Sequence, residues 1–305
     1  MTQITASQVK ELREKTGAGM MDAKKALEEV GGDTEAAIDF LRKKGLAKAE
    51  KKSSRTAAEG LVAIVSEGTT GAVVEVNSET DFVARNEQFQ GFVRQVAKNA
   101  SQAADLNDLM ASDMEGKTIT DTITNLVATI GENMSVRRME KLSVSEGAVI
   151  GYMHNAAAEG LGKIGVLVAL ESSGDQAALQ TLGKQLAMHV AAAFPKYLNR
   201  DEVDAAEMER EKNVIREQAL AEGKPAEIVE KMLEGRMRKF YEEICLLDQI
   251  FVVDGETKIS KLLDDAEKEV GAPVALKSYA RFQLGEGIEK EEEDFAAEVA
   301  KAANG

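Results

Sequence analysis

Cysteine and long apolar runs are scarce in this sequence, and each scarcity excludes a class of protein. Cys245 is the single cysteine among 305 residues, so no disulfide can form within the chain and a reducing compartment is favoured. No stretch of about 18 consecutive apolar residues occurs, as a membrane-spanning helix would require. The N-terminus lacks the apolar segment of a signal peptide. We therefore expect a cytoplasmic protein with no membrane partner.

Common catalytic motifs are also lacking. The nearest approach to a Walker A motif is Gly162-Lys163, but Ile164 follows it. The sequence has no G-x-G-x-x-G after a strand, no H-E-x-x-H, no C-x-x-C and no G-x-S-x-G. His154 and His189 lie far apart, so a histidine metal site or triad would need long-range convergence. We interpret His189 as a packed or helix-flanking residue, and predict a protein that is not an enzyme and needs no cofactor or metal.

Acidic residues outnumber basic ones, but unevenly along the chain. The formal net charge is -15, whereas residues 1–58 hold 12 basic and 9 acidic side chains and are net positive. The remainder is strongly negative and would repel the phosphates of DNA or RNA. The basic run from Lys43 to Arg55 is the exception. The charge distribution therefore argues against a general nucleic-acid binder.

The first 55 residues have the pattern of a three-helix bundle. Ser7 is a candidate cap for the first helix, glycines break it, and Asp33 is a candidate cap for the third. The three helices are expected within residues 4–44. The polar stretch KKSSRTAAEG that begins at Lys51 then indicates a linker.

Beyond the linker the sequence predicts two related α+β halves, each with a small antiparallel sheet covered by helices. Residues 60–77 contain two β-branched runs around Gly-Thr-Thr-Gly, typical of a hairpin, and Asn86 is a candidate cap for the next helix. TITDTITNLVATIG and SVRRMEKLSV then indicate a helix and a strand. In the second half GAVIGYMH and KIGVLVALES repeat the strand pair, a helix follows, and TKISKLLDDAEKEVG and KSYARFQLGEG repeat the last helix and strand.

A charged helical insertion interrupts the second half at residues 201–245. Gly223 and Pro225 separate two arms, as expected for a helix end and a helix start. Apolar residues recur at helical spacing on the second arm, namely Val229, Leu233, Met237, Phe240 and Ile244. We expect an antiparallel helical hairpin.

The fold class predicted is therefore α+β, and the chain divides into six segments. They are the N-terminal three-helix bundle (1–55), the first core subdomain (56–142), the first part of the second (143–200), the helical hairpin (201–245), the second part of the second (246–285) and a C-terminal helical module (286–305). The acid run EKEEEDF in the last segment is interpreted as a solvated helix start.

Met20 and Met21 are candidates for an exposed contact surface at the start of the second helix. They follow a Gly-Ala-Gly turn, and methionine suits protein contacts because it is flexible and polarizable. Adjacent helical residues point about 100° apart, so both cannot easily point inward. We expect one of them on the surface, the alternative being that at least one fills the bundle core.

Phe82 has two possible placements. If a helix begins at Asp81, Phe82 shares the buried face of Phe89. If Asn86 caps that helix instead, residues 80–85 form a loop and Phe82 stands at its tip. The sequence leaves the two placements open.

Four motifs, in order along nearly the whole chain, resemble the bacterial translation elongation factor Ts family. They are TGAGMMDAKKAL (16–27), VNSETDFVARNEQF (76–89), IGENMSVRR (130–138) and GEGIEKEEEDFAAEVA (285–300). The resemblance implies a guanine-nucleotide exchange protein for elongation factor Tu, the GTPase that delivers aminoacyl-tRNA to the ribosome. It also implies a ubiquitin-associated-like N-terminal bundle, a two-subdomain core, a protruding coiled coil and a C-terminal module.

The resemblance implies a set of contacts with the GTPase. Asp81 and Phe82 match an acid–aromatic pair that enters the nucleotide domain, with Phe82 near the magnesium and phosphate end. Met20 and Met21, with Arg13 nearby, match residues that dock on a helix of the same domain.

Two further contacts follow from the same resemblance. Ile130 and Gly131 match a contact at a helix end, and His154 aligns with a residue directed toward another domain of the partner. The hairpin after His154, with AAAEGLG, is longer than the family pattern.

Two rival functions belong to other classes. A nucleic-acid-binding or adaptor protein would use the basic bundle and the helical hairpin, and would show salt-sensitive RNA binding by residues 1–58 with no effect on a GTPase. A hydrolase or transferase would need distant acids to meet in a pocket. For an exchange factor, direct nucleic-acid binding is not expected, while a dimer of heterodimers and the role of the hairpin stay open.

Overall fold

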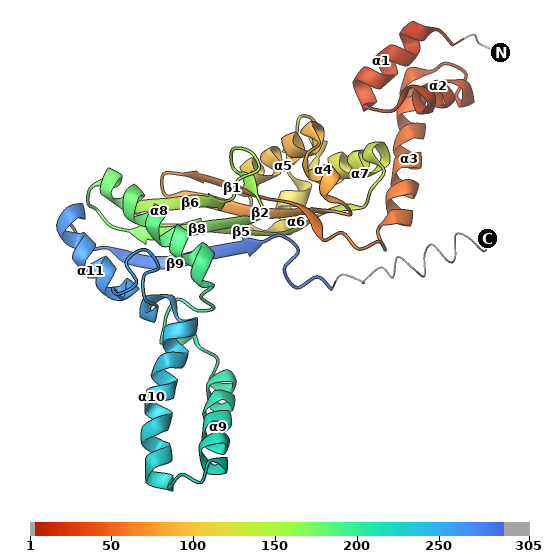
Figure 1. The fold of residues 1–305 in the computed structure, drawn as a ribbon. Coiled ribbons are helices and arrows are strands. Elements are labelled where there is room, and N and C mark those ends of the chain that lie inside the picture. The colour runs from red at the N-terminus through yellow and green to blue at the C-terminus, as the bar shows by residue number, and fades with distance from the viewer. Residues whose placement is uncertain (1–3, 290–305) are drawn as a thin grey trace. The chain divides into compact units, whose positions relative to one another are not determined.

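The computed structural model describes residues 4–289, apart from the side chains of Ala226 and Glu227 (Figure 1). The described chain forms two compact units. The first comprises residues 4–63, 74–139 and 282–289, and the second comprises 64–73 and 140–281. Most of the predicted C-terminal module, including the greater part of its acid run, lies outside the described residues. The described fold mixes helices with small antiparallel sheets, which confirms the α+β prediction.

The N-terminal bundle of the first unit consists of α1 (Ala6–Thr16), α2 (Met20–Glu29) and α3 (Thr34–Lys52). The prediction that Ser7 caps α1 is wrong, because Thr5, two residues earlier, is the N-cap and forms a reciprocal capping box with Gln8. Asp33 caps α3 as predicted, accepting from the Ala36 N–H at 3.0 Å. The three helices enclose a small core of buried residues: Val9, Leu12, Ala23, Ala26, Leu27 and Ala37.

Helix α3 is longer than the sequence pattern predicts. It continues to Lys52 instead of ending near residue 44, because its second half packs on α7 (Ile119–Ile130) of the same unit. An added Cβ at Gly45 would lie 3.4 Å from the Ala128 Cβ, and Arg42 pairs with Asp121 at 3.1 Å. Tertiary packing thus stabilises a polar helical segment that propensity alone leaves marginal.

The rest of the first half keeps the predicted order of hairpin, helix, helix and strand. It contains β1 (Glu59–Glu67), β2 (Thr70–Ser78), α4 (Asp81–Ala84), α5 (Glu87–Ala100), α6 (Leu106–Ala111), β3 (Asp113–Met114), β4 (Lys117–Thr118), α7 and β5 (Met134–Ser143). The sequence did not predict the short elements α4, α6, β3 and β4. A four-stranded sheet has the order β5-β2-β1-β7, with β7 at Leu161–Gly162. Asn86 caps α5 as predicted, accepting from the Phe89 N–H at 3.1 Å.

The second unit repeats the strand pair and its covering helices. Strands β6 (Gly147–His154), β8 (Ile164–Glu171) and β9 (Ala275–Gln283) form a sheet of order β6-β8-β9. Strands β6 and β8 are antiparallel, with Gly147 opposite Glu171. Helices α8 (Gln176–Ala193) and α11 (Ile259–Val270) cover this sheet through one apolar core.

Two glycines show that the halves are structural repeats. Gly60 and Gly147 both have φ near +120°, and an added Cβ would lie 2.2 Å from the Val76 and Leu170 carbonyl oxygens, respectively. Each glycine therefore lies at the start of a strand, Gly60 second in β1 and Gly147 first in β6, where the backbone of the neighbouring strand is too close for a side chain. In addition, α7 and α11 both end at a glycine in the left-handed conformation. The predicted internal repeat is thus visible in the backbone.

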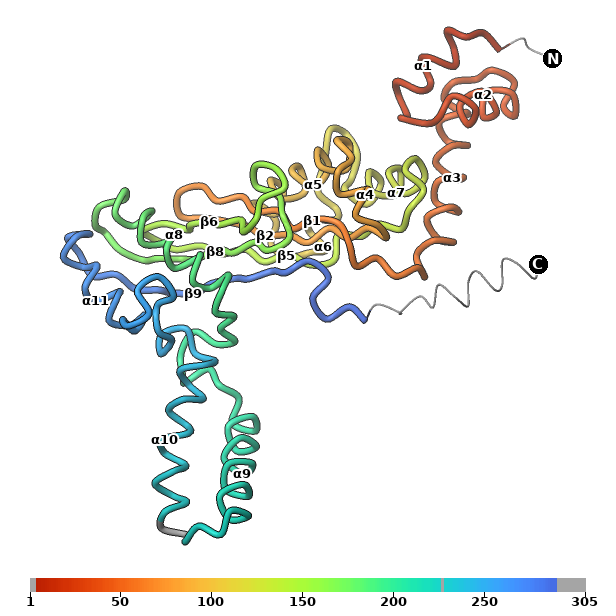
Figure 2. Tube along the Cα trace, viewed as in Figure 1, coloured from red at the N-terminus to blue at the C-terminus, as the bar shows by residue number. Residues whose placement is uncertain are grey.

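The predicted helical hairpin of the second unit is formed by α9 (Ala205–Ala221) and α10 (Ala226–Ile244), which lie side by side (Figure 2). Short turns flank it at Arg200–Glu202 and Leu246–Asp248. Pro225 is the N-cap of α10, one position before the predicted one. The two helices bury the expected stripe, including Ile215, Val229, Leu233 and Met237.

Glu75 is a fully buried carboxylate that ties three segments of the first unit together. From β5, Arg137 and Arg138 approach its oxygens to 3.0 Å and 2.6 Å. The backbone N–H of Gly285, beyond β9, donates to Glu75 Oε1 at 2.8 Å. Burial alone would raise the pKa of Glu75, but the hydrogen bonds from Gly285, Asn77 and Arg138 outweigh it and hold this pKa below its usual range.

Candidate partner-binding site

Phe82 lies on a separate four-residue helix, α4, between β2 and α5. Its side chain is 75% exposed, whereas the next residue, Val83, is 4% exposed and anchors the turn. Each of the two expected placements is half right. A helical turn does begin at Asp81, but Asn86 caps a new helix, so Phe82 does not share the buried face of Phe89.

Reciprocal hydrogen bonds join the segment before Phe82 to the segment after α7. Glu132 Oε2 accepts from the Thr80 backbone N–H at 2.9 Å, and Oε1 accepts from the Thr80 hydroxyl at 2.6 Å. In return, Glu79 Oε1 accepts from the Asn133 N–H at 2.5 Å. These bonds place Ile130 and Gly131 close in structure to Phe82, although the sequence separates them widely.

Met20 and Met21 are both exposed, at 61% and 74% of the residue surface. The interpretation in which at least one of them fills the bundle core is wrong, because Ala23, Ala26 and Leu27 fill that space. The two methionines therefore form one apolar surface on the first turn of α2.

Arg13 lies beside this surface, at the end of α1. It is exposed, and its Nε donates to the Ala18 carbonyl oxygen at 3.3 Å. This bond closes the turn from α1 to α2, so Arg13 supports the segment that presents the methionines and leaves most of its guanidinium to solvent.

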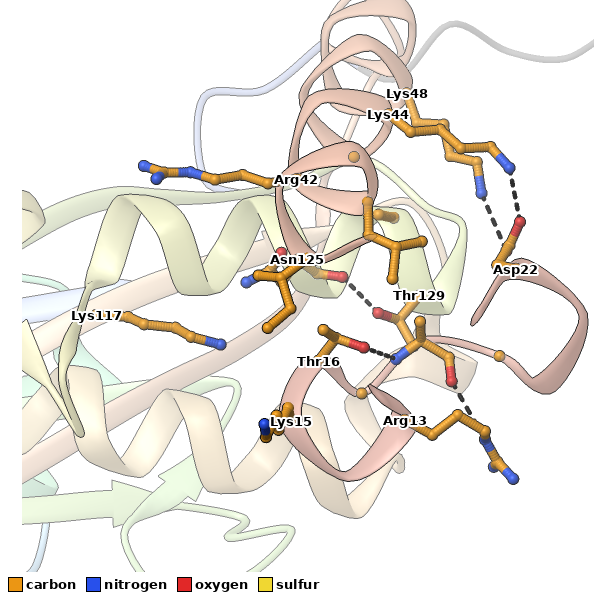
Figure 3. Close-up of a pocket in the computed structure, with 17 residues that line it drawn as sticks. Arg13, Lys15, Thr16, Asp22, Arg42, Lys44, Lys48, Lys117, Asn125 and Thr129 are labelled. Carbon is orange, nitrogen blue, oxygen red and sulfur yellow. Dashed lines mark hydrogen bonds and ion pairs between the residues drawn. The ribbon is translucent and has the colours of Figure 1, made fainter. Parts of the chain in front are cut away.

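A cavity of about 540 Å³ lies between the bundle and α7, within the first unit (Figure 3). Its lining contains one carboxylate, Asp22, and six cationic side chains. The cations are Arg13, Lys15, Arg42, Lys44, Lys48 and Lys117. Four of the six have an acidic partner: Lys44 and Lys48 share Asp22, Arg42 pairs with Asp121, and Lys15 pairs with Glu11. With a single carboxylate in its lining, this cavity offers no catalytic pair of acids.

His154 ends strand β6 in the second unit. Its Nδ1 lies 3.1 Å from the Tyr152 hydroxyl, and the side chain is partly exposed. The longer hairpin that follows folds back on itself, with the Ala157 N–H donating to the Leu161 carbonyl oxygen at 2.9 Å. His154 thus keeps a polar face open to solvent.

His189 is a packed structural residue, as the sequence predicts. It is fully buried in α8, its Nε2 lies 2.9 Å from Gln249 Oε1, and its Nδ1 accepts from the Val252 N–H at 3.3 Å. This acceptor role requires a neutral ring. Burial lowers the pKa of His189, against the opposing effect of Gln249.

The second unit also exposes an apolar surface that sequence reasoning missed. Val252 and Val253 are 48% and 62% exposed, and Ile250, Met188 and Phe194 are each more than one-third exposed. The signal in the sequence is IFVV, an apolar run directly before an Asp-Gly turn. Such a run is typical of a buried strand, whereas here it lies in a loop after the short turn at Leu246–Asp248.

None of the helices within residues 4–289 combines the length and the apolar character of a membrane span. No three His, Cys, Asp or Glu side chains of the described chain are arranged to hold a metal ion. What the described surface does offer is exposed apolar side chains held on well-packed elements, which is the chemistry of protein recognition.

Comparisons with known proteins place the chain in a family. A family model described as Elongation factor TS matches residues 79–286. The elongation factor Ts of Paramagnetospirillum magneticum (strain ATCC 700264 / AMB-1) is 62% identical, over 99% of this chain and 98% of the relative. That of Rhodospirillum rubrum is also 62% identical, over 98% of both chains, and that of Rhizobium leguminosarum bv. trifolii is 58% identical over 100% of both. The chain belongs to the elongation factor Ts family.

Proposed function

We propose that this chain is the guanine-nucleotide exchange factor of the GTPase elongation factor Tu. The proposal rests on the exposure of Phe82. This aromatic residue is 75% exposed although the fold around it is well packed, and the chain belongs to this family. Exchange makes and breaks no covalent bond, so it needs no catalytic pair. It needs a surface that fits the nucleotide-free GTPase better than the GDP-bound form.

The energetic basis of exchange is reciprocal coupling. If the factor weakens GDP binding by some ratio, GDP weakens the binding of the factor by the same ratio. Each ~1.4 kcal/mol of coupling corresponds to a tenfold change in affinity. Burial of a large aromatic side chain can contribute on the order of 2 to 3 kcal/mol, and Phe82 gains this only when the partner opens a pocket for it.

We assign the exchange step to α4 and its neighbours. Phe82 enters near the magnesium and phosphate end of the nucleotide site and displaces groups that hold the metal. Asp81 lies at the first position of the same helix. It pairs with Arg85 at 3.2 Å, but its side chain is 49% exposed, so the partner can reach the carboxylate at the rim of the contact. Ile130 and Gly131, held beside this segment, extend the contact surface.

We assign affinity to the other exposed groups. Met20 and Met21 dock on a helix of the nucleotide domain, with Arg13 at their edge. His154, in the second unit, faces another domain of the GTPase. These groups hold the two proteins together while the nucleotide leaves, so they act equally on the states before and after GDP release.

The test of the proposal is release of a fluorescent GDP from purified elongation factor Tu, with and without this chain. An exchange factor accelerates release in a saturable manner, and excess unlabelled GDP competes with it. Unchanged release at saturating concentrations of the chain would overturn the proposal. Salt-sensitive RNA binding by residues 1–58, without any effect on the GTPase, would instead support the nucleic-acid alternative.

Changing Met20 and Met21 together to alanine should weaken docking and leave the exchange step intact. Both side chains are exposed in the free chain, and burying them in a complex contributes roughly 1.5 kcal/mol or more each at full burial. We expect the half-saturating concentration for GDP release to rise at least about tenfold, with the maximal rate changed less than about twofold.

The matched control for the methionines is Val214→Ala on the helical hairpin, where an apolar side chain is 43% exposed. That variant should leave both kinetic parameters unchanged. A fall in maximal rate without a change in half-saturation would show that the methionines act on the exchange step and not on affinity.

A further inference from the structure

Helix α4 is too short to hold Phe82 in place by itself. It has four residues, and an isolated helical turn is unstable in water because nucleation costs more than the first hydrogen bonds return. Its N-cap residue, Thr80, makes no side-chain capping bond to the helix. Something outside α4 must therefore fix its position.

Val83 anchors α4 to the core through one buried side chain, and Glu132 adds a second, directional constraint at the start of the helix. Both carboxylate oxygens of Glu132 are used on one residue, accepting from the Thr80 backbone N–H at 2.9 Å and from the Thr80 hydroxyl at 2.6 Å. The Thr80 carbonyl oxygen is held as well, by the buried hydroxyl of Ser78 at 3.0 Å. Both donors of Thr80, its N–H and its hydroxyl, are thus directed to Glu132 and away from α4.

Hydrogen bonds and an ion pair also hold the segment that carries Glu132. The Asn133 N–H donates to Glu79, the Asn133 side-chain amide donates to the Arg55 carbonyl oxygen at 2.7 Å, and Arg55 pairs with Glu79 at 3.4 Å. Lys52, at the end of α3, donates to the Gly131 carbonyl oxygen. The segment that carries Glu132 is therefore held from two sides.

We propose that Glu132 is a positioning residue for nucleotide exchange, which orients α4 so that Phe82 projects from the surface at a fixed angle. The inference rests on the proposed role of Phe82. A side chain that must enter a pocket as it opens gains most when its approach is already ordered, because no orientational entropy is then lost on contact. Without Glu132, α4 samples several orientations and fewer of them are productive.

Glu132→Ala and Glu132→Gln separate positioning from charge. Alanine removes both acceptors, whereas the glutamine amide can accept from the Thr80 N–H and donate to the Thr80 hydroxyl. With elongation factor Tu carrying fluorescent GDP, we expect Glu132→Ala to lower the maximal release rate about fivefold and to change the half-saturating concentration less than about twofold. Glu132→Gln should stay within about twofold of the unchanged chain. Glu269→Ala, which removes an exposed carboxylate of α11, is the matched control.

A double variant shows whether Glu132 acts through Phe82. In the Phe82→Ala background, Glu132→Ala should add less than about twofold, because the group it positions is gone. If Phe82→Ala slows release but Glu132→Ala does not, or if their effects multiply, the positioning role is overturned while the proposed function stands. If Phe82→Ala itself has no effect, the proposed role of Phe82 falls and the inference falls with it.

Thr80 provides a second route should Glu132→Ala fail to fold, as thermal unfolding would show. Thr80→Ser keeps the hydroxyl that donates to Glu132, and Thr80→Val removes it at nearly the same volume. The positioning role requires Thr80→Val to lower the maximal rate and Thr80→Ser to retain it. Equal rates for these two variants would count against it.

Discussion

Replacing Phe82 by alanine should slow stimulated GDP release by about 30-fold at saturating concentration of the chain. This factor corresponds to losing on the order of 2 kcal/mol of burial that the ring gains only when the GTPase opens. Complex formation with the nucleotide-free GTPase should weaken less than the maximal rate falls, because the methionine surface is untouched. Stopped-flow release of fluorescent GDP measures the rate, and titration of the nucleotide-free GTPase measures the affinity.

The fold itself should not depend on Phe82. Since the ring is 75% exposed in the free chain, its truncation should change the free energy of unfolding by no more than about 0.5 kcal/mol. Leu220→Ala, which removes an apolar side chain 52% exposed on the helical hairpin, is the matched control and should release GDP at the normal rate. Equal losses of rate and affinity in Phe82→Ala and in the double methionine variant would contradict the separate roles assigned to them.

The largest effect on stability is expected at Glu75. Glu75→Ala removes a fully buried carboxylate, so the Gly285 N–H loses its acceptor and Arg137 and Arg138 keep only their bonds to the segment 283–286. Breaking a buried ion pair costs about 3 to 5 kcal/mol. We expect about 3 kcal/mol, at the low end, because the two guanidinium groups remain 29% and 30% exposed and can be hydrated. Urea unfolding followed by circular dichroism measures the difference.

Glu75 also predicts a dependence of stability on pH. Its pKa in the folded chain is depressed below the reference value of 4.5, so the folded state favours the ionised form. The resulting stabilisation is fully present above about pH 4.5 and is lost as the pH falls through the folded pKa.

Glu75→Gln isolates this contribution. The stability difference between the unchanged chain and Glu75→Gln should be constant near neutral pH and shrink below about pH 4.5. Glu217→Gln, at an exposed position on α9, serves as the control and should follow the unchanged chain. A difference that persists undiminished at pH 3 would mean that the ionised form of Glu75 is not what stabilises the fold.

Periodicity and turn chemistry predicted most of the elements. Strand β6 and helices α7, α8 and α10 lie where apolar spacing, glycines and caps place them, because these signals act within a few residues. The start of α1 was misplaced because Thr5 and Ser7 are both good caps, and the choice depends on which has a capping-box partner three residues on. Only Thr5 has one, in Gln8.

The exposure of the candidate site could not be predicted in the same way. Phe82 and Met21 are apolar residues next to helix starts, and the pattern alone allowed each to be buried. Their exposure depends on which neighbouring residues occupy the core instead. In α4 that residue is Val83, and in the bundle the alanines of α2 occupy it. The bond between Glu132 and Thr80 spans residues far apart in the sequence, and no local pattern marks it.

By itself, the sequence determined the order of helices and strands, the internal repeat, the inserted hairpin and, through four motifs, the family. Each of these depends on residues close together in the chain. The tertiary structure decided that α3 extends onto α7, that Phe82 and both methionines face solvent, and that Glu75 and Glu132 each hold segments distant in sequence. These features depend on contacts between segments that are distant in the sequence. The burial of a side chain or a long-range hydrogen bond requires both segments, so neither segment's own sequence predicts it.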